Sequence, residues 1–193
     1  MLKKVIAVVA MMLFAGVASA EMIGMYADMD ATICQGPIAP GAPTSYYVIA
    51  TLTQLADVGI TAAEFKIDNL PISDYAAGGF VTPEWTSAVT VGDPWTDFSI
   101  AWSTPQGAGT GLVHIGTLSF LCFNPAWVGA DHMMEFVEGD TCQCLVVVDE
   151  AFVSVTAIGG KFWANCTDPA QCQCIEEPTA TQDTSWGSVK ALF

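Results

Sequence analysis

GLVHIGTLSFLCF, residues 111–123, has the residue pattern of a β-strand. Leu118 and Phe120 alternate with Thr117 and Ser119, which is the two-residue period of a strand that buries one face and exposes the other. Half-buried strands of this kind are typical of antiparallel sheets. The stretch therefore predicts an antiparallel all-β fold.

Other short β-rich stretches follow one another along the chain, and Gly- and Pro-rich turns such as GPIAPGAP at 36–43 separate them. No stretch between them has a long helical period. Short strands with such turns predict an antiparallel two-sheet sandwich of about nine strands, stapled by disulfides. The expected strands are Met22–Ala27, Tyr46–Leu55, Ile60–Leu70, Phe80–Val89, Phe98–Ser103, Gly111–Phe123, Met133–Glu138, Cys144–Asp149 and Ala151–Ala164.

The N-terminal residues 1–20 have the features of a secretory signal peptide. Lys3 and Lys4 precede an apolar run that ends at Val17, and small residues lie at Ala18 and Ala20. The run is shorter than the ~20 residues that span a bilayer. We therefore expect cleavage after Ala20, a secreted, periplasmic or cell-surface location, and no membrane span in the mature chain.

The charge balance excludes partners that are bound through basic surfaces. The chain has five lysines, no arginine and 20 acidic residues, a formal charge of -15. Without Lys3 and Lys4, three lysines would stand against the 20 acidic residues, a formal charge of -17. Nucleic-acid binding requires the opposite sign, and the 52% hydrophobic content excludes a disordered chain. We expect one β-sandwich domain at 21–174.

The cysteines predict a disulfide framework, since export favours oxidation. Cys142 and Cys144 lie two apart on an expected strand, where their side chains would share a face, so we expect them not to bond each other. We expect the segment 166–174 to be stapled to that strand, and Cys122 to be a buried thiol or the partner of Cys34. The alternative is a zinc or copper(I) site built from two C-x-C pairs, although the spacing matches no zinc pattern. The seven cysteines are Cys34, Cys122, Cys142, Cys144, Cys166, Cys172 and Cys174.

No catalytic motif occurs in the sequence. G-x-S-x-G and H-E-x-x-H are both absent, and neither His114 nor His132 has a second histidine at ligand spacing. We therefore expect a non-enzymatic binding or surface-structural module. The alternative is a secreted hydrolase that uses two of the carboxylates as an acid–base pair.

Calcium is the one cofactor that the sequence suggests. Asp28 and Asp30, and Asp149 and Glu150, place carboxylate oxygens near the expected ends of the sandwich. No D-x-D-x-D-G loop accompanies them. Exposed aromatic residues could bind a protein or a glycan, and Trp85 and Trp95, which lie near Pro83 and Pro94, are the expected surface candidates.

Two stretches share a pattern of alternation and glycine placement. GITAAEFKIDNLP at 59–71 has alternating apolar residues that end near Leu-Pro, and 111–120 begins with glycine and ends with a small–apolar–Phe pattern. Both stretches are similar to the strand pattern of cohesin-like modules. The resemblance implies an immunoglobulin-like β-sandwich that binds protein and has no catalytic residues, since cohesins hold dockerins. The seven cysteines and the acidic loops depart from the family, so no binding residue is carried over.

The C-terminal residues predict a separate docking or sorting tail. Residues 175–184 form a polar linker, and residues 185–193 include Trp186, Val189, Lys190 and Phe193. This ending is similar to short tails on exported proteins of some uncultivated bacteria, which begin with Trp-Gly and end with an aromatic residue. We expect it to dock to an extracellular or cell-envelope component; the alternative is a frayed end.

Overall fold

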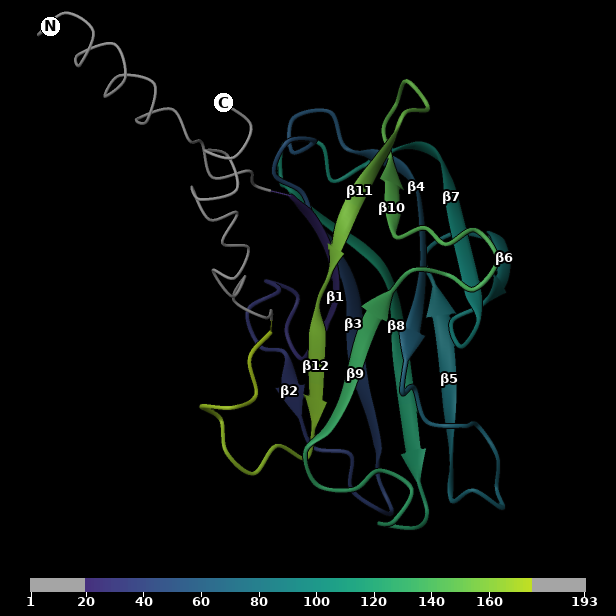
Figure 1. Cartoon of the computed structure of the whole chain (residues 1–193), viewed down its shortest axis with the longest axis vertical. Coiled ribbons are helices and arrows are strands. Elements are labelled where there is room, and N and C mark those ends of the chain that lie inside the picture. The colour runs from purple at the N-terminus through teal and green to yellow at the C-terminus, as the bar shows by residue number, and fades with distance from the viewer. Residues whose placement is uncertain (1–19, 175–193) are drawn as a thin grey trace, which may run out of the picture.

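The structure is a computed structural model that describes residues 20–174, and it is built from twelve β-strands (Figure 1). Within these residues there is no helix that could span a membrane. The expected linker and tail, and the signal peptide apart from Ala20, lie outside the described residues. The strands are β1 (Glu21–Tyr26), β2 (Gln35–Gly36), β3 (Pro43–Thr51), β4 (Ile60–Asp68), β5 (Gly79–Trp85), β6 (Val89–Asp93), β7 (Asp97–Gln106), β8 (Leu112–Cys122), β9 (His132–Val137), β10 (Val146–Val148), β11 (Ser154–Gly159) and β12 (Lys161–Ala164).

The first sheet has β8 near its middle, between β3 and β5 and antiparallel to both. β1 pairs with the other edge of β3, which gives the order β5–β8–β3–β1. The predicted alternation along β8 is confirmed, because Leu118 and Phe120 are fully buried while Thr117 and Ser119 are half-buried. The inner face of this sheet is one wall of the core.

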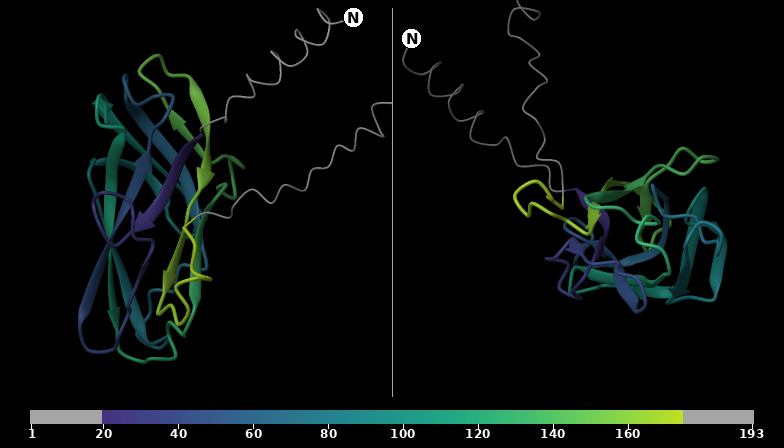
Figure 2. Two further views of the ribbon diagram at one scale, coloured as in Figure 1. Left: turned by 90° about the vertical axis from the view of Figure 1, so that its left-hand side faces the viewer. Right: turned by 90° about the horizontal axis from the view of Figure 1, so that it is seen from below.

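The second sheet is organised around β4. β7 pairs with one edge of β4 and continues to β6, while β9 and β10 share the other edge. β12 and β2 follow beyond β9. The two sheets form two layers (Figure 2) that are joined along one side, where β11 pairs with both β10 and β1.

The all-β class is confirmed, whereas the strand count and the purely antiparallel pairing are corrected. The expected strand Ala151–Ala164 is two strands, β11 and β12, and β1–β11 and β2–β12 pair in parallel. The division lies at Gly159 and Gly160. A Cβ on Gly159 would lie 1.7 Å from the carbonyl oxygen of Phe136, so only glycine lets the backbone pass this close as it leaves β1 and joins β9.

The core between the sheets is rich in aromatic side chains. Phe65 lies at its centre, with its ring centroid 5.3 Å from those of both Phe98 and Phe136. Tyr46 packs on Phe162 with centroids 4.4 Å apart. All five side chains are at most 3% exposed, and burial of each contributes on the order of 1.5–3 kcal/mol to folding. This core gives the sandwich a rigid interior.

The expectation that Trp85 and Trp95 lie on the surface is wrong. Trp85 is half-buried and stacks on Phe98 with centroids 4.1 Å apart. Trp95 is also half-buried, and its indole N–H donates to the Pro71 carbonyl at 3.1 Å. Pro83 lies within β5, which among the described strands pairs only with β8, and such an edge strand tolerates a missing backbone N–H.

Candidate functional site

The cysteines form three disulfides and leave one free thiol. Cys122 is fully buried and free, which confirms the expected buried thiol, and its Sγ lies 3.2 Å from the Asn124 carbonyl oxygen. The expected staple between the segment 166–174 and the Cys142/Cys144 strand is wrong. The bonded pairs are Cys34–Cys174, Cys142–Cys144 and Cys166–Cys172.

The Cys142–Cys144 bond contradicts the expectation that these two cysteines share one face of a strand and do not bond each other. β10 begins only at Val146, so the two cysteines lie in the loop that follows β9 and not on a strand. Gln143 has a φ of 51°, a left-handed conformation that turns the flanking side chains toward each other. The two Cα atoms are 5.2 Å apart, within the range of a disulfide.

The Cys34–Cys174 bond closes a second, smaller apolar cluster on the outer face of the first sheet. Tyr26 of β1 and Ile49 of β3 point to this face, and the loop that contains Cys34 covers them. Each of the three side chains is at most 3% exposed. Cys174 lies against this cluster, and its carbonyl accepts the Lys161 N–H at 2.7 Å. The bond thus holds the end of the described chain to the sheet.

The four calcium candidates lie in two separate turns, and calcium binding stays a prediction. Asp28 accepts the Thr32 hydroxyl at 2.6 Å and the Ile33 N–H at 2.7 Å. Burial raises the pKa of Asp28, but the Thr32 side chain and the backbone N–H groups outweigh burial and hold the pKa below its usual value.

The second pair, Asp149 and Glu150, lies in the turn between β10 and β11. Asp149 accepts the N–H groups of Ala151 and Val153, both at 2.8 Å. Within residues 20–174, neither pair belongs to a group of three His, Cys, Asp or Glu side chains with ligand atoms within 4.8 Å of one another. Asp28 and Asp149 therefore each stabilise the turn in which they lie.

A hollow of about 400 Å³ beside Trp163 contains two carboxylates, Asp131 and Asp168. The backbone N–H and hydroxyl of Thr167 hold the pKa of Asp131 below its ordinary value. Asp168 accepts the Ala170 N–H at 3.0 Å and so closes a turn. Both carboxylates therefore accept hydrogen bonds from neighbouring residues, Asp131 from Thr167 and Asp168 from Ala170.

The two histidines also have structural partners. The His114 ring lies edge-on to Tyr47, and its Nε2 is 3.2 Å from the Thr117 hydroxyl. His132 Nε2 lies 2.8 Å from the Asn69 carbonyl oxygen. Neither histidine belongs to the metal-ligand groups found in the described part of the chain.

Three aromatic rings gather at one end of the first sheet, where β5 begins and β8 ends (lower end of Figure 1), and an exposed aliphatic residue lies in the adjoining loop. Tyr75, Phe80 and Phe123 are 74%, 37% and 47% exposed. The Phe123 centroid lies 5.7 Å from Tyr75 and 5.9 Å from Phe80. Ile72, 71% exposed, lies in the same loop as Tyr75. We call these four residues the aromatic patch.

The backbone beneath the aromatic patch is fixed by hydrogen bonds. Asp74 and Gly79 exchange backbone hydrogen bonds of 3.0 and 3.2 Å, and the Phe123 N–H donates to the Gly78 carbonyl at 2.8 Å. Gly79 lies against the Trp127 ring, where an added Cβ would come within 2.3 Å. The patch is therefore held on a preformed support.

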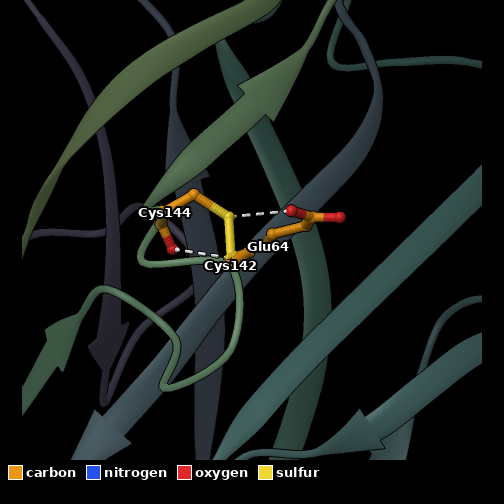
Figure 3. A group of neighbouring side chains, drawn as sticks. All are labelled: Glu64, Cys142 and Cys144. Atoms are coloured by element: carbon orange, nitrogen blue, oxygen red, sulfur yellow. Dashed lines mark hydrogen bonds between the residues drawn. A yellow bond between two sulfur atoms is a disulfide. The ribbon is translucent and has the colours of Figure 1, made fainter.

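A different cluster lies on the outer face of the second sheet. Cys144 Sγ lies 2.9 Å from Glu64 Oε2, and Cys142 Sγ lies 3.8 Å from Asp97 Oδ1. Figure 3 shows the disulfide lying across β4, with the Glu64 carboxylate beside Cys144. The Ser99 hydroxyl donates to the other Glu64 oxygen at 3.1 Å. Among residues 20–174, Glu64, Cys142 and Cys144 form one of two groups of three His, Cys, Asp or Glu side chains whose ligand atoms lie within 4.8 Å of one another.

Three solved structures similar to this chain are cohesin modules. The sixth cohesin of scaffoldin B from Acetivibrio cellulolyticus, solved with a dockerin mutant, is 12% identical with a TM-score of 0.41. A cohesin of a family 33 glycoside hydrolase from Clostridium perfringens is 6% identical with a TM-score of 0.44. A cohesin from a type I cohesin–dockerin complex of Clostridium thermocellum is 10% identical with a TM-score of 0.35. The alignments cover 76–77% of this chain and 99% of each module. No protein-family model and no curated protein matches the chain.

Proposed function

We propose that this chain is a non-enzymatic protein-binding module that binds its partner through the aromatic patch. The observation that carries the proposal is the contact among Tyr75, Phe80 and Phe123, three rings that remain exposed on a rigid support. Clustered exposed apolar side chains on a folded domain mark interaction sites. Aromatic residues are also the most frequent anchors of protein interfaces.

The orientation of the rings favours a protein over a glycan. Tyr75 is inclined at 53° to Phe123, and Phe80 is inclined at 86° to the same ring. A flat sugar-stacking platform requires rings that are nearly coplanar. Rings at these angles instead form an uneven apolar surface, which can accommodate side chains of a protein segment.

The charge of the domain specifies the polar chemistry of the partner. Glu84 lies four residues after Phe80 in β5, on the same face of the strand, and Asp74 precedes Tyr75 in the loop before β5. Both acidic residues are exposed. The chain has 20 acidic residues against five lysines. We therefore assign the partner an apolar segment flanked by Lys or Arg, because complementary charge directs encounter and orientation.

Export of the module is part of the proposal. Glu21, the residue after the expected cleavage point, begins β1 and is fully buried. Its carboxylate accepts the N–H groups of Thr53, Gln54 and Leu55 at 2.6, 3.0 and 2.8 Å. A domain that begins directly after Ala20, together with three disulfides, supports cleavage and an oxidising location.

Selection from a displayed library of random peptides tests the binding function. The mature chain is expected to enrich apolar peptides that contain Lys or Arg. The double variant Tyr75→Ser/Phe123→Ser should bind the enriched peptides about tenfold or more weakly, since anchors of this kind dominate interface energy. Its melting temperature should stay close to that of the wild type, because both side chains are exposed.

Phe152→Ser is the matched control, since Phe152 is 82% exposed and lies in the turn between β10 and β11, outside the patch. This variant should bind the enriched peptides as the wild type does. Equal loss in both variants, or enrichment of acidic peptides, would contradict the proposal. Glycan-array binding that the double variant abolishes would assign the patch to a sugar instead.

A further inference from the structure

We propose that the Cys142–Cys144 disulfide is a thiol–disulfide exchange site whose substrates are protein or peptide thiols with a positive charge near the cysteine. This activity is separate from binding at the aromatic patch, because it belongs to the outer face of the other sheet. The inference rests on the span of the bond, the support of its loop, the unequal exposure of the two sulfurs and the surrounding charges.

The span of the bond argues against a purely structural role. A disulfide stabilises a fold mainly by restricting the unfolded chain, and the effect grows with the enclosed length. Cys34–Cys174 joins residues 140 apart, whereas Cys142–Cys144 joins residues two apart. The Cys142–Cys144 bond, which encloses the shorter stretch of chain, also requires Gln143 at a φ of 51°, which is unfavourable for a non-glycine residue. Its contribution to stability is therefore the smallest among the three.

The loop that contains the bond is held by other contacts. The Gly139 N–H donates to the Cys144 carbonyl at 3.1 Å, and the Gln143 N–H donates to the Gly139 carbonyl at 2.9 Å. Lys66 Nζ forms a 2.9 Å ion pair with Asp140. These contacts do not involve the sulfur atoms, so the two thiols of a reduced loop stay close together. Such proximity makes reoxidation an effectively intramolecular step.

The two sulfurs are not equivalent. Cys142 is exposed, while Cys144 is half-buried beside Glu64. The remaining disulfide cysteines are half-buried or buried. Exposed disulfides are the ones that exchange readily. Because Cys142 is the more exposed of the two, its Sγ is the sulfur that an incoming thiolate attacks, and Cys144 is the leaving group.

The exchange is balanced as a two-electron transfer from a substrate dithiol. The first substrate thiolate forms a bond to Cys142 Sγ, and the Cys142–Cys144 bond breaks. Cys144 leaves as a thiolate, takes a proton from solvent and, as a thiol, donates to Glu64 Oε2. The second substrate thiolate then attacks the substrate sulfur of the mixed disulfide, and Cys142 leaves and is protonated. The substrate is oxidised to a disulfide, and Cys142 and Cys144 are reduced to thiols.

The charges at the site select the substrate. Glu64 lies beside one sulfur and Asp97 beside the other, at 2.9 and 3.8 Å. Lys66, a cation two residues from Glu64 on β4, is already paired with Asp68 and Asp140. Anionic thiols are therefore repelled, and a cysteine next to Lys or Arg is favoured.

Two small thiols of opposite charge test the inference on the full mature chain. Cysteamine and 3-mercaptopropionate are added at low ionic strength, the reaction is stopped by alkylation, and each cysteine is followed by peptide mapping. Each rate is divided by the rate of the same thiol with hydroxyethyl disulfide, which removes intrinsic reactivity. We expect Cys142–Cys144 to open about tenfold faster than the other two bonds, and cysteamine to be the preferred thiol, with a preference that salt reduces.

Glu64→Gln separates electrostatics from folding, because it keeps the size of the side chain. The preference for cysteamine should fall in this variant. The pH profile of Cys144 alkylation in the reduced protein should also move to lower pH, because a neighbouring negative charge disfavours the thiolate. Opening of all three disulfides at similar rates, or equal normalised rates for the two thiols, would overturn the inference. Neither readout depends on peptide binding at the aromatic patch.

Discussion

The outer face of each sheet is covered by a loop that contains at least one disulfide-bonded cysteine, and the two loops differ in what lies beneath them. Under the Cys34 loop, Tyr26 and Ile49 form an apolar cluster. Under the Cys142–Cys144 loop lie the carboxylate of Glu64 and the Lys66–Asp140 ion pair. The first disulfide joins distant parts of the chain over an apolar surface, whereas the second lies within a loop that hydrogen bonds already hold. We therefore expect the Cys34–Cys174 disulfide to stabilise the fold and the Cys142–Cys144 disulfide to take part in thiol–disulfide exchange.

The largest expected difference between the two faces is in stability. Replacing Cys34 and Cys174 with serine should lower the free energy of unfolding by about 5 kcal/mol, and replacing Cys142 and Cys144 by only about 1.5 kcal/mol, because loop entropy grows with the enclosed length. Urea unfolding of both double variants, with the wild type as reference, measures this difference. Equal losses in the free energy of unfolding would show that the two disulfides stabilise the fold equally.

Alkaline pH probes the apolar cluster of the first face. Burial, and to a smaller extent the Asp28 charge, raise the pKa of Tyr26 to about 12. The unfolded tyrosine loses its proton near pH 10, so the stability contributed by the neutral ring is complete below pH 10 and is lost as the pH rises to about 12. The loss is up to about 2–3 kcal/mol.

Tyr26→Phe should reduce this alkaline loss, as followed by urea midpoints between pH 9 and 12. The comparison variant is Tyr46→Phe, since burial also raises the pKa of Tyr46 to about 12 in the main core. An unchanged pH dependence in Tyr26→Phe would mean that the small cluster opens before the tyrosine ionises.

The smallest expected effect concerns the second face. Lys66→Met removes the ion pairs to Asp68 and Asp140 and should change global stability little, because exposed ion pairs contribute little and are screened by salt. Amide hydrogen exchange at Asp140, whose N–H donates to the Thr96 carbonyl at 2.9 Å, should nevertheless become faster. Unchanged exchange there would mean that the backbone hydrogen bonds alone hold the loop.

Local patterns in the sequence predicted those features that depend on neighbouring residues. The alternation in β8 predicted which of its side chains are buried, and Cys122 between two apolar residues predicted a buried thiol. The aromatic patch also had a local signal. Phe80 is out of phase with the buried Val81, and Phe123 follows the buried Cys122, so both point to the outer face.

The disulfide partners could not be predicted in the same way. Cys34 meets Cys174 because both lie beside β12, where the Cys34 carbonyl accepts the Trp163 N–H and the Cys174 carbonyl accepts the Lys161 N–H. Cys142 meets Cys144 because the left-handed Gln143 interrupts the strand geometry on which the expectation was based. The sequence predicts Trp85 on the surface because it lies near Pro83, but Phe98, the ring on which Trp85 stacks, belongs to the other sheet.

The sequence by itself determined the all-β class, the strongly acidic surface and the faces of the main strands, because residue period and composition act locally. Only the tertiary structure decided which cysteines bond, which aromatic rings remain exposed and which carboxylate lies beside a sulfur. These outcomes depend on contacts between residues far apart in the chain. Their positions are set by packing the two sheets around one core, and the residue pattern of any single strand does not contain that information.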